Sequence, residues 1–132
     1  MKPNFICPKC GGFLNVGDKI VLVAESKQKK AGLIFFSPEI GNYLTSRNPG
    51  FEITEGEKNE FFCPLCHKKL AADIHDNLSR IIMVDKKNDE YEILFSKIAG
   101  EKSTYKIVGE STEIFGEHHS NYIDFINLSQ NK

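Results

Sequence analysis

Four cysteines in two pairs are the residues of this chain best suited to metal chemistry. Cys7 and Cys10 lie in the stretch FICPKCGGFL, and Cys63 and Cys66 lie in FFCPLCHKKL, 56 positions later. The two stretches share Phe, Cys, Pro, Cys and Leu at matched positions. A gap of two residues lets one tight turn direct both sulfurs at the same ion, and two such turns supply four thiolates. The spacing therefore predicts a closed tetrahedral site, which is typical of structural zinc.

The neighbours of each pair also favour a tight turn. Pro8 and Pro64 restrict the backbone inside the turns, and Gly11 and Gly12 follow the first pair. Glycine there permits the positive φ that such a turn needs. His67 holds the place of Gly11 in the second stretch. Because four sulfurs already complete a tetrahedral shell, we expect His67 to contact solvent or protein rather than the metal.

Other uses of the cysteines fit the sequence less well. Disulfides require an oxidising compartment, but the N-terminal stretch MKPNFICPKCGG lacks the apolar core of a signal peptide. A thioredoxin-type redox pair requires a helix after the first cysteine, whereas glycines follow one pair and no βαβ pattern surrounds either. Iron is the alternative metal, since four cysteines in this arrangement hold either ion.

Through CPKCGG and CPLCH, residues 5–70 resemble the zinc-ribbon and rubredoxin-like group of knuckle domains. This resemblance implies two knuckles that meet at the end of a β-sheet and bind one metal ion through the four cysteines. The 52 residues between Cys10 and Cys63 exceed the separation usual in compact members of the group, so an inserted hairpin and loop are expected there. Residues 80–132 have no counterpart in the group.

Runs of β-branched and apolar residues predict strands over most of the chain. Residues 18–26 and 31–37 are two such runs around a polar KQKK turn, which predicts a β-hairpin. Residues 37–50 carry two Pro and two Gly without a sustained period, which predicts the longest irregular loop. Residues 51–62 alternate and lead into the second cysteine pair, which predicts a strand bent at Gly56.

The C-terminal part predicts a second β element. Residues 80–109 contain three strand-like runs separated by polar turns, which is typical of a three-stranded meander. A short turn or helix is expected over residues 70–78 and a short helix near residues 122–128. The predicted fold is mostly β: a zinc-ribbon-like antiparallel sheet with two Cys knuckles, then the meander and the C-terminal helix. We expect a ribbon-like part over residues 1–78 and a meander plus tail over residues 79–132, packed as one compact unit.

Composition limits the classes of function. Hydrophobic residues make up 40% and charged residues 27%, which is typical of a folded protein. The net charge is -1, so no overall field draws the chain to polyanions. No apolar run approaches the roughly 18 to 20 residues of a membrane span. We therefore expect no membrane contact, and reduced thiols together with the missing signal peptide predict a cytoplasmic protein.

No nucleophile motif, Gly-rich phosphate loop or HExxH sequence is present, so we expect no enzyme activity. The predicted function is a noncatalytic zinc-binding module whose structural site presents loops to a protein or nucleic-acid partner. The alternative is a rubredoxin-like iron electron carrier. Local basic residues would form one face if the hairpin tip lay beside the second knuckle. These residues are Lys27, Lys29, Lys30, Lys68 and Lys69.

The remaining histidines predict no second metal site. His118 and His119 are adjacent, and adjacent residues on a strand point to opposite faces. No carboxylate spacing around His118 and His119 marks a ligand set. We expect these two side chains and that of His75 to be solvated.

Overall fold

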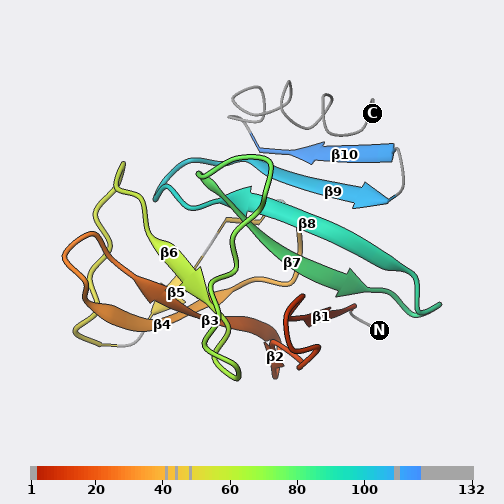
Figure 1. The fold of residues 1–132 in the computed structure, drawn as a ribbon, viewed down its shortest axis with the longest axis horizontal. Coiled ribbons are helices and arrows are strands. Elements are labelled where there is room, and N and C mark those ends of the chain that lie inside the picture. The colour runs from red at the N-terminus through yellow and green to blue at the C-terminus, as the bar shows by residue number, and fades with distance from the viewer. Residues whose placement is uncertain (1–2, 41, 44, 48, 109–110, 117–132) are drawn as a thin grey trace.

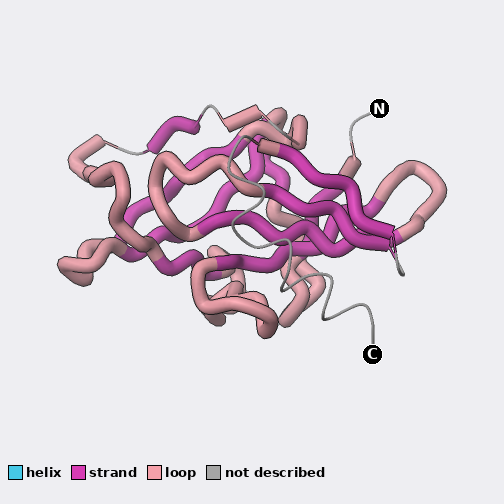
Figure 2. The backbone as a smooth tube through the Cα atoms, turned by 90° about the horizontal axis from the view of Figure 1, so that it is seen from above, coloured by secondary structure: helices cyan, strands magenta, loops and turns pink. Residues whose placement is uncertain are grey.

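The computed structural model describes residues 3–40, 42–43, 45–47, 49–108 and 111–116, and Figure 2 shows strands and loops there but no helix. Within these ranges no helix is available to cross a membrane. The predicted helix near residues 122–128 and the pair His118 and His119 lie outside the described residues. The strands are β1 (Asn4–Ile6), β2 (Asn15–Val16), β3 (Lys19–Glu25), β4 (Ala31–Phe36), β5 (Thr45–Arg47), β6 (Glu60–Phe62), β7 (Leu78–Val84), β8 (Glu90–Ser96), β9 (Thr104–Val108) and β10 (Ser111–Phe115).

The strands form two antiparallel sheets, each with five strands in the described part of the chain (Figure 1). The first sheet has the order β1-β7-β8-β9-β10. The second has the order β2-β3-β4-β5, and β6 also pairs with β3. The predicted hairpin is confirmed as β3 and β4, and the predicted meander as β7, β8 and β9. The meander is joined to the N-terminus, because β1 pairs with β7.

The strand predicted over residues 51–62 is wrong in its extent. Only Glu60–Phe62 forms a strand there. The chain before it leaves the second sheet: the Gly56 amide donates to Ala99 O at 2.8 Å, and the Asn59 amide donates to Lys97 O at 2.8 Å. These backbone groups therefore bond to the segment after β8 and not to a neighbouring strand of the second sheet. Alternation in the sequence could not reveal this partner. Residues 70–78 contain turns rather than a helix.

In the described part of the chain, the segment from β1 to β5 and the segment from β6 to β9 are structurally equivalent halves, so the repeat extends far beyond the cysteine stretches. In the first half β3 pairs with β4 so that Leu22 lies opposite Ile34, and in the second half β7 pairs with β8 so that Ile81 lies opposite Ile93. Each of these positions is 59 residues from its equivalent. The same offset relates β5 to β9 and the two hairpin turns, where Lys29 and Asn88 have φ of 65° and 66°.

The two halves exchange their first strands. β1 belongs to the first half but pairs with β7 of the second, with Phe5 opposite Met83. β6 belongs to the second half but pairs with β3 of the first, with Phe61 opposite Ala24. Equivalent residues occupy equivalent registers in the two pairings. Because each half completes the sheet of the other, the two sheets form one interdependent unit.

The main hydrophobic core lies between the sheets and receives side chains from both halves. Phe5, Ile81 and Ile93 come from the first sheet, and Leu22 and Phe61 come from the second. All five are less than a tenth exposed. Burial of such side chains contributes about 1.5–3 kcal/mol each. The buried cysteines Cys7 and Cys63 are part of the same cluster, so the cysteine site borders the core.

Candidate metal centre

Each cysteine pair lies in a tight turn with the same backbone hydrogen bonds. One bond closes the turn, and a second runs within it from the residue after the second cysteine to the carbonyl of the first. In the first knuckle the bonds are Cys7 N–H to Gly12 O and Gly11 N–H to Cys7 O, both at 2.9 Å. In the second they are Cys63 N–H to Lys68 O at 3.1 Å and His67 N–H to Cys63 O at 2.9 Å. The two similar cysteine stretches of the sequence therefore form turns of the same structure.

The residue after each pair has the left-handed backbone conformation. Gly11 has φ of 73° and His67 has φ of 64°. A residue with a side chain accepts this conformation at a cost of about 1–2 kcal/mol, so only the first copy has the unstrained residue. His67 is exposed, and the group of side chains close enough to share an ion contains the four cysteines without it. His67 thus contributes its backbone conformation to the turn.

The four sulfurs converge on one point. All four Sγ atoms lie within 4.8 Å of one another, and the pairs Cys7–Cys66 and Cys10–Cys63 are each separated by 3.8 Å. Four sulfurs at about 2.3 Å from a central ion in a tetrahedron are about 3.8 Å apart. A disulfide would require about 2.05 Å. The donor set therefore fits one four-coordinate metal ion, and both zinc and iron accept four thiolates.

Backbone amides point at the sulfurs in a pattern that repeats between the knuckles. Amide donors stabilise thiolate charge and restrict the direction of each ligand. Cys7 Sγ accepts from Lys9 N at 3.3 Å and from Cys10 N at 3.4 Å, and Cys63 Sγ accepts from Leu65 N at 3.3 Å and from Cys66 N at 3.4 Å. Cys10 Sγ accepts from Gly12 N at 3.4 Å, and Cys66 Sγ accepts from the backbone of Lys68.

The four thiols differ in how deeply they are buried. Cys7 and Cys63 are buried, Cys66 is half-buried and Cys10 is exposed. Desolvation by burial raises the pKa of Cys63 to about 12, whereas the backbone hydrogen bond from Lys68 lowers the pKa of Cys66. The Cys63 thiol, with its raised pKa, consequently keeps its proton at neutral pH when no cation is bound. An ion that binds all four sulfurs has to displace that proton, and its affinity therefore rises with pH.

The knuckles lie where the chain crosses from one sheet to the other. After the first knuckle, the Leu14 amide donates to Phe5 O in β1 at 2.8 Å, while Leu14 O accepts from Val21 N in β3 at 2.9 Å. After the second knuckle, the Leu70 amide donates to Phe61 O in β6 at 2.8 Å, and Leu70 O accepts from Arg80 N in β7 at 3.0 Å, so this crossing runs from the second sheet to the first. Each leucine is thus hydrogen-bonded to both sheets. The cysteine cluster joins the β1 edge of one sheet to the β6 edge of the other.

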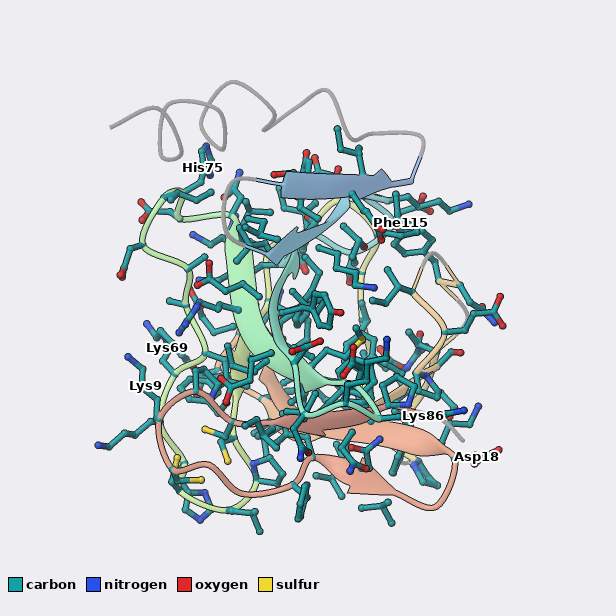
Figure 3. All side chains as sticks on the ribbon, turned by 90° about the vertical axis from the view of Figure 1, so that its right-hand side faces the viewer. Lys9, Asp18, Lys69, His75, Lys86 and Phe115 are labelled. Atoms are coloured by element: carbon teal, nitrogen blue, oxygen red, sulfur yellow. The ribbon has the colours of Figure 1, made fainter. Side chains whose placement is uncertain are left out.

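The surface around the cysteines is both basic and apolar. We call Lys9, Phe13, Leu65, Lys68 and Lys69 the knuckle face, because all five are exposed residues in or next to the two turns. Phe13 is 65% exposed and Leu65 is 59% exposed. Figure 3 shows Lys9 and Lys69 on the same side of the molecule, beside the sulfur atoms. Lys68 and Lys69 belong to the basic face predicted from sequence, whereas Lys9 and the exposed Phe13 do not.

The basic face proposed from sequence is not formed in its full extent. Phe62 pairs with Val23, and β6 runs antiparallel to β3, so the second knuckle continues away from the β3–β4 turn. Lys27 and Lys30 lie in that turn, at the opposite end of β3. Lys68 and Lys69 are therefore grouped with Lys9 and not with the lysines of the turn. His75 lies far from the sulfurs, at the other end of the view in Figure 3.

Comparison with known proteins found no family model that matches the chain, and no similar curated protein or solved structure. The resemblance to knuckle domains therefore extends to the two turns and their four convergent sulfurs.

Proposed function

We propose that the four cysteines hold one structural zinc ion, which joins the two sheets of a noncatalytic binding module. The observation that supports this most directly is the position of the knuckles at both crossings between the sheets. One ion bound there restrains β1, β2, β6 and β7 together. A site filled by four sulfurs leaves no open position for water or substrate, which suits a structural role.

The short edge strands explain why a cross-link is useful. β1 and β6 have three residues each, and β2 has two. Strands this short form few ladder hydrogen bonds, and each net bond contributes only about 1 kcal/mol. A metal site of four thiolates contributes far more to folding. The ion therefore stabilises the crossings that the hydrogen bonds alone hold weakly.

The metal that the native protein binds distinguishes the proposed structural function from the alternative, an iron electron carrier. The exposure of Cys10 favours the alternative, because an exposed ligand gives electrons a short path to a partner. We expect the purified native protein to be colourless and to contain one equivalent of zinc. Elemental analysis and an absorption spectrum measure both properties. Thiolate-to-iron absorption bands and reversible one-electron reduction of the native protein would contradict the structural zinc site and support the iron electron carrier.

The knuckle face is the surface that supports binding to an anionic partner. Its three lysines attract negative charge, and Phe13 offers a flat apolar surface on which a nucleobase can stack. We therefore propose single-stranded nucleic acid as the first partner to test. An acidic protein surface is the other partner that the same charges accept.

A titration with single-stranded oligonucleotides at two salt concentrations tests this surface. We expect binding at low salt that weakens as salt rises, with a logarithmic slope of about 0.7 for each phosphate neutralised. The double variant Lys68→Ala/Lys69→Ala should lower this slope by about 1.4. The matched control is Lys27→Ala/Lys30→Ala, which removes the same charge from the distant β3–β4 turn. Absence of binding at low salt, or equal effects of the two variants, would exclude a nucleic-acid function of the knuckle face.

A further inference from the structure

A cavity of about 260 Å³ lies between the two sheets. Its walls are mainly apolar and come from equivalent positions of the two halves. The residues that form these walls include Leu22 and Ile81, Ile34 and Ile93, and Phe36 and Phe95. The cavity is thus formed by the symmetric arrangement of the two hairpins and is distinct from the cysteine site.

The space is partly open to solvent, so it is a pocket of ligand size rather than an enclosed void in the interior. Interiors are packed like organic crystals, and voids larger than a water molecule are few. An apolar cavity of about 150 Å³ remains dry and binds benzene. The cavity between the sheets is larger, so it has room for one or two rings. Phe36 and Phe95 lie in edge-to-face contact at 5.8 Å on its wall, and further aromatic rings favour the same arrangement.

The polar groups of the cavity indicate that its ligand is uncharged. Lys97 lines the cavity with 3% of its side chain exposed, and its Nζ lies 2.7 Å from Glu60 Oε1. The buried ammonium group is therefore already neutralised. The other charged lining residues are two of each sign: Glu39, Arg47, Glu101 and Lys102. A charged ligand would lose its hydration without a surplus of opposite charge to replace it.

Two residues that line the cavity, Tyr43 and Thr104, hydrogen-bond to each other through their hydroxyl groups. Tyr43 Oη and Thr104 Oγ1 lie 2.8 Å apart. Tyr43 belongs to the connection between β4 and β5, and Thr104 begins β9, so the two hydroxyls come from different sheets. Tyr43 is half-buried, whereas Thr45, Arg47 and Lys102 are exposed lining residues. Tyr43 and Thr104 therefore line the same cavity as these exposed residues.

We propose that this cavity binds an uncharged aromatic molecule of one or two rings that carries one hydrogen-bonding group. The rings pack against the isoleucine and phenylalanine side chains of both sheets. The hydrogen-bonding group reaches the hydroxyls of Tyr43 and Thr104. This binding is independent of the partner that the knuckle face contacts, and it gives the module a second, small-molecule ligand.

Titration of the metal-loaded full chain with indole tests the proposal by methyl NMR. We expect the methyl resonances of Ile34, Ile81 and Ile93 to shift saturably, with a dissociation constant on the order of 10–1000 μM. Ile114, which is 42% exposed on β10, should not shift and serves as the internal control. Benzoate, a charged ring of similar size, should bind about tenfold more weakly. Absence of saturable shifts at the three cavity residues, or tighter binding of benzoate, would overturn the proposal.

Variants that fill the cavity provide the matching test. Ile34→Phe and Ile93→Phe add volume at equivalent positions of the two walls, so at least one should retain the native fold. Each folded variant, judged by its amide spectrum and metal content, should bind indole about tenfold more weakly than the native chain. Ile114→Phe makes the same change on β10 and should bind as the native chain does. Undiminished indole binding by a folded cavity variant would show that the ligand lies elsewhere.

Discussion

Removal of the metal under reducing conditions is expected to unfold both sheets together. An ion held by the four cysteines would join the β1 edge to the β6 edge, and each half supplies the first strand of the other half's sheet. Apparent zinc-binding free energies of about 10–16 kcal/mol in small structural sites match or exceed the whole stability of a typical domain. We therefore expect the loss to reach beyond residues 1–78 and to include β7, β8 and β9.

Amide NMR spectra before and after treatment with a strong chelator measure this effect. The chelated protein should lose its chemical-shift dispersion in both sheets, and addition of one equivalent of zinc should restore it. Elemental analysis must confirm that the metal has left. If dispersion then persists throughout the described residues, the ion does not hold the fold. If β7, β8 and β9 alone persist, the first sheet is stable without its exchanged strand.

Replacement of Lys97 by alanine is expected to destabilise the protein by about 3 kcal/mol. The Lys97 side chain is 3% exposed and lies 2.7 Å from Glu60, which is 26% exposed. Glu60 Oε1 has no hydrogen bond, so this ion pair is the contact that compensates its burial. Without the ammonium group the carboxylate is left largely buried beside the core. Urea unfolding monitored by circular dichroism gives the change in free energy.

A double-mutant cycle separates the ion pair from the packing of the lysine side chain. Glu60→Gln removes the carboxylate charge that would be unpaired once Lys97 is replaced. Lys97→Met removes the ammonium group and retains most of the apolar side chain. The double variant Lys97→Met/Glu60→Gln should be more stable than Lys97→Met alone, because no unpaired charge remains. Additive effects of the two substitutions would mean that the pair contributes nothing beyond its individual side chains. Lys29→Met is the control, since Lys29 is 83% exposed and its ion pair with Glu25 is solvated.

The candidate site could be predicted from sequence because its information is local. A two-residue gap between cysteines, with proline inside and glycine after it, specifies a turn regardless of the rest of the chain. The recurrence of that turn specified four convergent sulfurs, and the structure places them within 4.8 Å of one another. The hairpin turns around Lys29 and Asn88 were equally local, since polar residues interrupt apolar runs of β-branched character.

The pairing of β1 with β7 and of β6 with β3 was decided by the tertiary structure. Three-residue strands carry too few alternating positions to specify a partner, and their registers depend on which core face buries Phe5 and Phe61. Equivalence of the halves was hidden for a related reason: packing between sheets requires apolar volume at matched positions but tolerates different residues, such as Leu22 and Ile81. The cysteine turns required particular side chains and so remained visible in the sequence. The sheets required only apolar side chains at alternating positions, and many arrangements of strands satisfy that pattern until the two layers pack against each other.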